Sequence, residues 1–281
     1  MTERKGSILI LVMWVLIILS FLSIAVSYRA SGDIKLAKYE SENMKASYLA
    51  KAGVVKMIAE LKRDNNNYDS INEEWNKEKE FSIGGGRIIY RASDESARFN
   101  LNTSDLNRYK EDLIGLGLDS GMSQKLLDYR IQKGEKGFEF IEELFLIDSM
   151  TRDIYSNIKD YVTIYRASDP KININTVGEN VLRAFVDNEL VTNKIIEFRN
   201  GNDGRAGTED DGVFTEANFS VIFKDFGIRS EDILNYQSMF NTRSEFFRIL
   251  VDVSFSEGER MIKHVTSVTD RSGKIYYWKE E

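Results

Sequence analysis

The residues best suited to chemistry lie in one acidic, glycine-rich stretch of the sequence, NGNDGRAGTEDDGV. It contains Asp203, Glu209, Asp210 and Asp211, and Glu216 follows shortly after it. Glycine allows sharp bends that present carbonyl oxygens, and dense carboxylate and carbonyl oxygens suit Ca²⁺ better than Zn²⁺ or Mg²⁺. We expect Asp203, Asp210 and Asp211 to ligate Ca²⁺, with Glu209 or Glu216 completing the shell. A solvated acidic turn without metal is the alternative, and both interpretations stay open here.

Other chemistry has little support in the sequence. The chain has no Cys and a single His, His264, which excludes thiol catalysis and disulfides and argues against a Ser-His-Asp triad or a multi-His metal site. The run Gly84-Gly85-Gly86 lacks the following Lys-Ser/Thr of a phosphate loop. The pairs Glu73-Glu74 and Glu142-Glu143 are better explained as solvated helix faces than as acid/base pairs. We therefore expect no enzyme.

Length, composition and charge describe a folded, acidic protein. The 281 residues are 42% hydrophobic, 11% aromatic and 30% charged, which is too apolar for wholesale disorder. The net charge is -7, whereas proteins that neutralise phosphates need an excess of Lys and Arg. Nucleic acid is therefore not an expected partner.

The amino-terminal region predicts a membrane-spanning helix. After Lys5 no charged residue occurs until Arg29, and 23 uncharged residues form a helix of about 35 Å, which spans a hydrocarbon core of about 30 Å. The basic residues precede the span, so we expect the short head to stay cytoplasmic and the C-terminal bulk to lie outside.

The helix is predicted to continue beyond the membrane as a stalk to about Arg63. Small and apolar residues recur there at intervals that place them on one helical face. They are Ala37, Met44, Tyr48, Ala52, Val55 and Ala59. A membrane anchor with a helical stalk is the simplest interpretation of this pattern.

The amino terminus of the chain resembles the leader of a type IV prepilin, because Lys5-Gly6-Ser7 is followed directly by the apolar helix. The resemblance implies that a prepilin peptidase cuts after Gly6 and leaves a mature chain that begins, N-methylated, at Ser7. The fifth mature residue is usually Glu in that family and is Leu11 here. A buried carboxylate needs a cation, which the family takes from the amino terminus of a neighbouring subunit. A subunit with no neighbour above it needs no such carboxylate, so Leu11 favours a position at the tip.

An internal repeat organises the middle of the chain. RFNLNTSD at 98–105 is echoed by KININTVG at 171–178, and KLLDYR at 125–130 is echoed by KIIEFR at 194–199. Each unit presents Asn-x-Asn-Thr before a helix start and an aromatic residue, Phe138 or Phe214, ahead of a later helix. We expect two repeated helical units in one α-rich domain.

The first unit resembles the helix-hairpin-helix modules of DNA-binding proteins, which raises a DNA-uptake role as an alternative. Such modules approach phosphates through Gly-apolar-Gly turns. The corresponding turns here are Asp119-Ser120-Gly121 and Asp148-Ser149-Met150, each with a carboxylate. Residues 98–232 contain 17 Lys and Arg against 25 Asp and Glu, a net charge of -8 that would repel DNA. The module is therefore expected to serve packing or protein contact.

Strand patterns flank this helical region. Residues 80–93 read as a hairpin that turns at Gly84-Gly85-Gly86, and the carboxyl end reads as three strands with turns near Glu257-Gly258 and Ser272-Gly273. His264 is expected as a half-exposed strand residue. The expected fold is α+β: a pilin-like long N-terminal helix with an antiparallel sheet and a large inserted α-helical domain of helix-hairpin-helix or SAM-like type.

Together with the leader, the repeat and the terminal strands, the segment ASYLAKAG at 46–53 resembles the type II secretion minor pseudopilin called general secretion pathway protein K. The resemblance implies a non-enzymatic subunit at the tip of the pseudopilus, anchored in the inner membrane with its bulk in the periplasm. Implied partners are the I and J minor pseudopilins, the major pseudopilin and the prepilin peptidase. Homologues bind calcium in the helical domain, which supports Ca²⁺ in the acidic stretch. A minor pilin of a type IV pilus is a further alternative.

These expectations divide the chain into five parts. They are a leader at 1–6, a transmembrane and assembly helix at 7–28, a helical stalk at 29–63, a pilin-like head at 64–97 and 241–281, and the inserted domain at 98–240.

Overall fold

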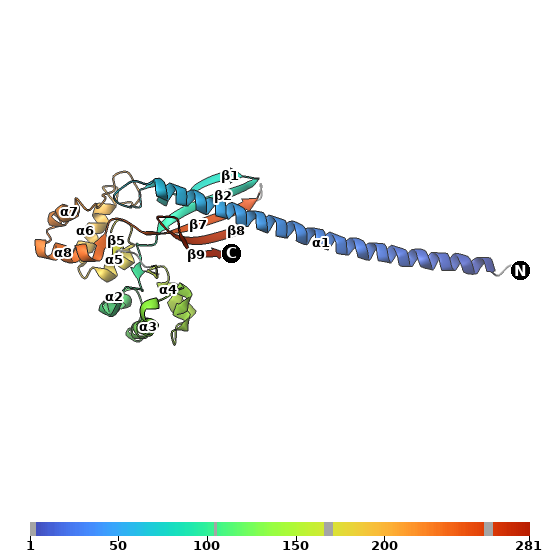
Figure 1. Cartoon of the computed structure of the whole chain (residues 1–281), viewed down its shortest axis with the longest axis horizontal. Coiled ribbons are helices and arrows are strands. Elements are labelled where there is room, and N and C mark those ends of the chain that lie inside the picture. Colours follow the sequence, from blue (N-terminus) through green and yellow to red (C-terminus); the bar gives the residue numbers. More distant parts are fainter. Residues whose placement is uncertain (1–3, 104–105, 166–170, 256–260) are drawn as a thin grey trace.

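The computed structural model describes residues 4–103, 106–165, 171–255 and 261–281. One helix, α1 (Arg4–Arg63), extends far beyond the rest of the molecule, and a sheet packs along its C-terminal part (Figure 1). At 60 residues α1 is about 90 Å long. The shorter helices gather at the end remote from the N-terminus. The predicted combination of a long N-terminal helix with an antiparallel sheet and further helices is confirmed.

The sheet is antiparallel and contains five strands in the order β1-β2-β7-β8-β9. Its strands come from both sides of the helical region, as the sequence predicts. They are β1 (Lys79–Ile83), β2 (Gly86–Asp94), β7 (Phe246–Phe255), β8 (Met261–Asp270) and β9 (Ile275–Glu280). The β1–β2 turn contains Gly84 and Gly85, both with positive φ, and Gly273 has positive φ in the β8–β9 turn. The predicted turn at Glu257-Gly258 lies outside the described residues.

Small residues let α1 approach the sheet closely. Ala46, Ala50 and Gly53 are buried against it, and a Cβ at Gly53 would lie 2.7 Å from Cγ1 of Val251. Val54 and larger buried residues continue the same face, and alternate residues of β2 and β7 meet them. This core is formed by α1, the sheet and Trp75 of the short 3₁₀ helix η1 (Glu74–Asn76).

The helical part, defined here as residues 99–241, has its own hydrophobic core. Its α-helices are α2 (Lys110–Gly115), α3 (Ser120–Lys133), α4 (Arg152–Ile158), α5 (Glu179–Phe185), α6 (Glu189–Arg199), α7 (Phe219–Asp225) and α8 (Ser230–Met239). Its 3₁₀ helices are η2 (Leu106–Tyr109), η3 (Gly134–Lys136) and η4 (Ile141–Leu146). Its strands are β3 (Phe99–Asn100), β4 (Val162–Thr163), β5 (Ile172–Asn173) and β6 (Phe240–Asn241).

The second Asn of each Asn-x-Asn motif forms the same pair of hydrogen bonds in both units. The Asn102 side chain accepts a hydrogen bond from the Phe138 N–H (2.7 Å) and donates to its carbonyl (2.8 Å). Asn175 does the same with Phe214, at 2.8 Å and 2.9 Å. Each unit also closes with a parallel two-residue ladder, β3 with β4 and β5 with β6. The repeated motif therefore produces the same contact twice, which we call the clamp. In each unit a buried Asn side chain is hydrogen-bonded to both the N–H and the carbonyl of an aromatic residue.

This clamp gives a stability prediction. Asn175→Ala leaves the N–H and carbonyl of Phe214 without this partner, and unpaired buried backbone groups cost about 1–3 kcal/mol each. We expect the free energy of unfolding to fall by about 2–4 kcal/mol in chemical denaturation of the full chain in detergent. The control is Asn180→Ala, an exposed amide with one hydrogen bond, to Tyr161. Equal stability of the two variants would contradict the clamp.

Candidate functional site

The stalk presents two apolar faces, of which the sheet covers one. Ala46, Ala50, Val54, Met57 and Leu61 are buried. The predicted stripe lies on the opposite face, since its members are offset from these residues by about half a helical turn. Its large members stay exposed, with Met44 at 63%, Tyr48 at 66% and Val55 at 63%. The structure thus adds a face that the sequence pattern did not single out, and no other element among the described residues covers the predicted stripe.

The apolar N-terminal part of α1 is similarly uncovered by the other elements that the structure describes. In the described part of the chain, one helix is long and apolar enough to cross a membrane, and its most apolar 18-residue window is not buried. Leu11, the position where the family usually has Glu, is 64% exposed on it. The backbone of Gly6 and Ser7 is helical, whereas residues 1–3 of the predicted leader lie outside the described residues.

The acidic loop after α6 brings three of the five predicted metal ligands together. The Thr208 hydroxyl oxygen lies 3.4 Å from Oδ1 of Asp203, 2.8 Å from Oδ1 of Asp210 and 3.0 Å from Oδ1 of Asp211. A hydroxyl has one proton, so it can donate to only one of these oxygens at a time. The three carboxylates therefore surround one hydroxyl, but their oxygens do not all lie within 4.8 Å of one another, and a cation would have to draw them closer. Glu209 is exposed, and Glu216 lies beyond the loop, just before α7.

Backbone groups hold these carboxylates in place. Oδ2 of Asp210 accepts the N–H groups of Asn202 (2.6 Å) and Asp203 (3.1 Å), and Oδ2 of Asp211 accepts that of Gly207 (2.6 Å). Hydrogen bonds from the Thr208 hydroxyl and from the N–H groups of Asn202 and Asp203 lower the pKa of Asp210. The carboxylate thus stays ionised, as metal binding requires. Thr208 itself was not predicted, because a hydroxyl carries no charge pattern in the sequence.

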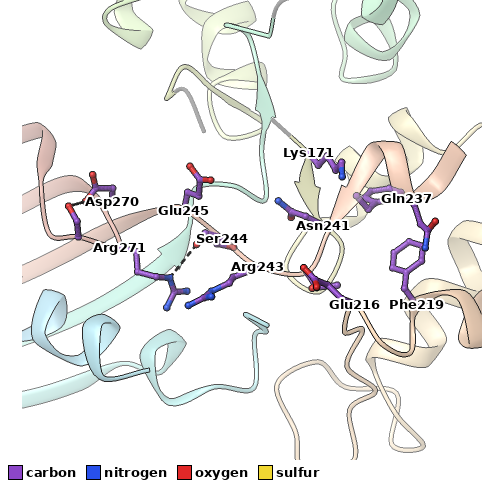
Figure 2. A pocket seen from close by; sticks show the side chains of 13 residues that line it. Lys171, Glu216, Phe219, Gln237, Asn241, Arg243, Ser244, Glu245, Asp270 and Arg271 are labelled. Atoms are coloured by element: carbon purple, nitrogen blue, oxygen red, sulfur yellow. Dashed lines mark hydrogen bonds between the residues drawn. The ribbon is translucent and has the colours of Figure 1, made fainter. Parts of the chain in front are cut away.

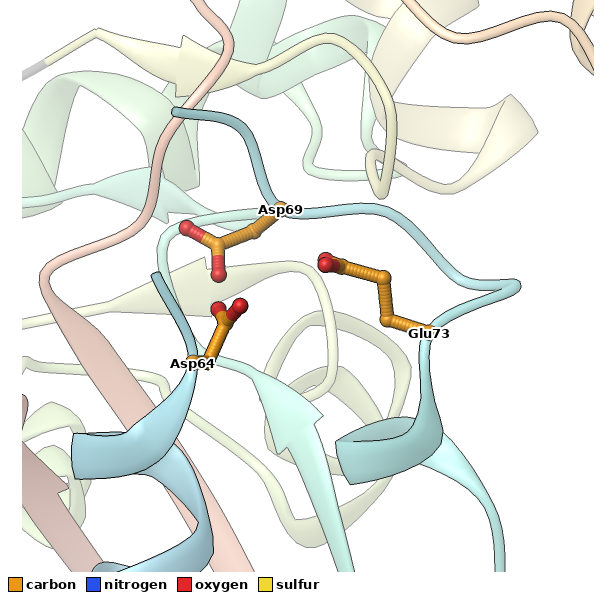
Figure 3. Close-up of side chains that lie close together, drawn as sticks. All are labelled: Asp64, Asp69 and Glu73. Atoms are coloured by element: carbon orange, nitrogen blue, oxygen red, sulfur yellow. The ribbon is translucent and has the colours of Figure 1, made fainter. Parts of the chain in front are cut away.

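A second carboxylate cluster escapes sequence reasoning altogether. The ligand oxygens of Asp64, Asp69 and Glu73 lie within 4.8 Å of one another, just beyond the end of α1 (Figure 3). Arg271, in the β8–β9 turn, donates to Asp69 and, at 3.3 Å, to Asp64. Burial raises the pKa of Asp69, while the Arg271 charge opposes that shift. The guanidinium thus supplies positive charge at this cluster, which ties the end of α1 to the sheet.

A buried carboxylate joins the sheet to the helical part. Asp94, at the end of β2, accepts hydrogen bonds from the Asn173 amide (3.1 Å), the Ser96 N–H (2.7 Å) and the hydroxyls of Thr176 and Ser244. Burial raises its pKa to about 6 in spite of these donors. The joint therefore depends on a group that changes charge close to neutral pH.

No protein-family model matches the sequence, and no curated protein matches it. The fold is similar to that of a chain in the crystal structure of the GspK-GspI-GspJ complex from the type 2 secretion system of enterotoxigenic Escherichia coli. The TM-score is 0.61 at 13% identity, over 90% of this chain and 99% of that chain. The likeness establishes the fold, and it confirms at that level the resemblance to a minor pseudopilin that the sequence predicts.

The Asp94 joint predicts a specific pH dependence. A carboxyl whose pKa is raised on folding binds its proton more tightly when folded, so its contribution to stability falls as pH rises from about 4 to about 6. A shift of about two units corresponds to about 3 kcal/mol at most. The difference in unfolding free energy between the wild type and Asp94→Asn should therefore shrink as pH rises from 4 to 7.

The control is Asp128→Asn, because Asp128 is an exposed carboxylate on α3. A pH dependence of the same size in this variant would show that the effect does not come from the Asp94 joint. An Asp94→Asn difference that grows with pH would contradict a raised pKa.

Proposed function

We propose that the chain is a minor pseudopilin of a type II secretion system, placed at the tip of the pseudopilus, where it nucleates assembly and supports protein secretion. The observation that carries this proposal is α1. Its apolar segment and its stalk stripe are exposed, whereas the opposite stalk face is buried against the sheet. Such a helix is suited to sit in the inner membrane and then to pack laterally against similar helices.

Two features support the tip position. Leu11 brings no carboxylate into the apolar bundle, so this subunit needs no ammonium from a subunit above it. The helical part gathers at the end of the molecule remote from the N-terminus, where its bulk would obstruct a subunit stacked above it (Figure 1). Minor pseudopilins of the I and J types are the proposed lateral partners, and the solved structure with the similar fold is a complex that contains GspI and GspJ. The major pseudopilin would add from below, and the bulk would lie in the periplasm.

The role proposed is mechanical and needs neither nucleic acid nor catalysis. The charge of -8 over residues 98–232 would repel DNA, which weighs against a DNA-uptake role. The single histidine, His264, is half-buried on β8 with its Nδ1 2.5 Å from Oδ1 of Asp252, a pairing between neighbouring strands. This pairing supports a structural role for His264.

Processing tests the proposal most simply. A prepilin peptidase should cut after Gly6, so mass spectrometry of the native protein should find a mature chain that begins at N-methylated Ser7. In cells without the peptidase the chain should keep its leader. Native protein that begins at Met1 while the peptidase is intact would refute the assignment.

The exposed stripe gives a second test. Tyr48→Asp and Val55→Asp place charge on a face of α1 that no other described element of the chain covers, so the fold should keep its stability. Copurification with other minor pseudopilins should fall at least about tenfold, because a charge buried between helices is costly. Lys38→Asp, on an exposed part of α1 outside the stripe, should have little effect. Undiminished copurification of the stripe variants would contradict lateral packing.

Calcium binding by the acidic loop remains part of the proposal. The convergence of Asp203, Asp210 and Asp211 on the Thr208 hydroxyl supports it. Millimolar Ca²⁺ should raise the melting temperature of the full chain, and Asp210→Asn should abolish the rise. Glu197→Gln, an exposed carboxylate on α6 outside the loop, should leave it intact. No thermal shift in the wild type would remove calcium from the account.

A further inference from the structure

The polar cleft between the sheet and the second helical unit carries charges of both signs. Its volume is about 770 Å³, and Figure 2 shows Arg271 of the β8–β9 turn and Phe219 of the helical part on opposite sides of it. Arg243 and Glu216 also line it. A ligand that one of these two attracts is repelled by the other, so the cleft defines no class of ligand.

The part of the stalk that lies along the sheet carries charge of one sign (Figure 1). We call residues 44–63 the distal stalk. It contains five Lys and Arg residues against a single acid, Glu60, which gives a net charge of +4 in a chain whose net charge is -7. The five cations, all exposed, are Lys45, Lys51, Lys56, Lys62 and Arg63. The distal stalk is therefore a basic patch on an acidic protein.

The carboxylates that the chain brings to the distal stalk have other partners. Glu60 accepts a hydrogen bond from Lys79 at 2.8 Å. Glu280, which accepts from the Ser47 hydroxyl, pairs with Lys263 at 3.4 Å. None of the five cations forms an ion pair with a carboxylate of the residues that the structure describes. Within this part of the chain their charge is thus not balanced.

Aromatic rings of the sheet hold two of the ammonium groups in place. Nζ of Lys45 lies 5.1 Å from the centre of the Phe255 ring, and Nζ of Lys56 lies 4.2 Å from the centre of the Phe81 ring. A ring face attracts a cation but has no net charge. The rings therefore position these ammonium groups and leave their charge available to an anion.

The cations border the exposed stripe on both sides. Three of them follow one another at intervals of 11 and 7 residues, which are close to whole numbers of helical turns, so they fall on one line along α1. These three are Lys45, Lys56 and Arg63. Lys51 and Lys62 are likewise 11 residues apart and fall on a second line. The apolar stripe of the distal stalk lies between the two lines of positive charge.

This pattern distinguishes between possible occupants of the stripe. A second copy of the chain would bring a net charge of +4 against another +4, and like charges across an interface repel. Anionic lipid is out of range, because Lys45 is 17 residues beyond Tyr28, about 26 Å along the helix. Electrostatic attraction to a membrane surface falls off within about 10 Å. An apolar helix edged with carboxylates matches both the stripe and its borders.

We propose that the distal stalk docks against the N-terminal helix of a different pseudopilin subunit, and that carboxylates border the apolar stripe of that helix. The inference rests on the proposed function, because it takes the partner to be another pseudopilin. The two stripes bury apolar surface, while the flanking charges decide which subunit packs here, as they do in other helix pairs.

Zero-length cross-linking tests the pairing directly. The full chain, copurified in detergent with the other minor pseudopilins, is treated with a carbodiimide, which joins a lysine amine to a carboxylate when the two are in contact. Mass spectrometry should find lysines of the distal stalk joined to Asp or Glu in the N-terminal helix of another subunit. Cross-links of these lysines to a second copy of the chain, or to no other subunit, would overturn the proposal.

Charge reversal gives a second measure. Lys45→Glu combined with Lys56→Glu should lower copurification at least about tenfold, because like charges then face each other. Lys45→Arg combined with Lys56→Arg keeps both charges and should preserve copurification. The matched control, Lys35→Glu combined with Lys38→Glu, reverses two charges on α1 outside the distal stalk and should have little effect. An equal loss in this control would count against the distal stalk as the docking surface.

A further variant separates lost docking from lost folding. Lys51 lies 5.4 Å from the ring of Tyr48 on α1 itself, so it makes no ring contact with the sheet. Lys51→Glu should leave the melting temperature of the free chain unchanged and should still lower copurification several-fold. Copurification that survives both this variant and the double reversal would refute the docking surface.

The result is separable from that of the proposed function. A wild-type chain that copurifies with no other pseudopilin would refute the proposed function, and this inference with it. A chain whose copurification depends on the stripe residues Tyr48 and Val55 but not on the five cations would refute this inference alone.

Discussion

An apolar helix that none of the other described elements covers needs another surface to exclude water from it. The side chains of α1 from Ile8 to Val26 are largely exposed, and each large apolar side chain left in water forgoes about 1.5–3 kcal/mol. A bilayer or a bundle of similar helices removes that cost. The apolar segment of α1 can lie in a bilayer, and the exposed stripe of the stalk can pack against similar helices. The sheet, by burying only one side of the stalk, preserves this surface.

Hydrogen-bonded groups, together with an aromatic contact between Tyr165 and Phe246, connect the helical part to the sheet. The sheet with α1 and the helical part have separate hydrophobic cores, and hydrogen-bonded groups connect them. Asp94 and Asn173 meet between the two, while Arg271 ties the end of α1 to the sheet through Asp64 and Asp69. Hydrogen bonds depend more on direction than apolar packing does, so such joints favour one orientation.

Local patterns predicted much of this architecture. The uncharged run predicted the long helix, Gly84 and Gly85 predicted the hairpin turn, and the repeated Asn words drew attention to the residues that clamp Phe138 and Phe214. The choice of the stalk face against the sheet was not predictable in this way, because small and apolar residues recur at helical spacing on both faces of the stalk. Ala46, Ala50 and Val54 follow the same period as the exposed stripe, so periodicity alone does not say which face is buried. The Asp64–Arg271 pair joins residues far apart in sequence, and only the three-dimensional fold reveals it.

The absence of cysteine in the native chain makes lateral packing directly measurable. A single Cys can be placed in turn at each position from Ile8 to Val26, in cells whose other pseudopilins each carry one engineered Cys in the N-terminal helix. Disulfide cross-links formed with an added oxidant can then be scored. If α1 packs against neighbouring helices, cross-linking should recur with a period of about 3.6 residues along one face. Uniform labelling of every position by a membrane-soluble maleimide, with no cross-link to another subunit, would show a plain lipid anchor and contradict the account.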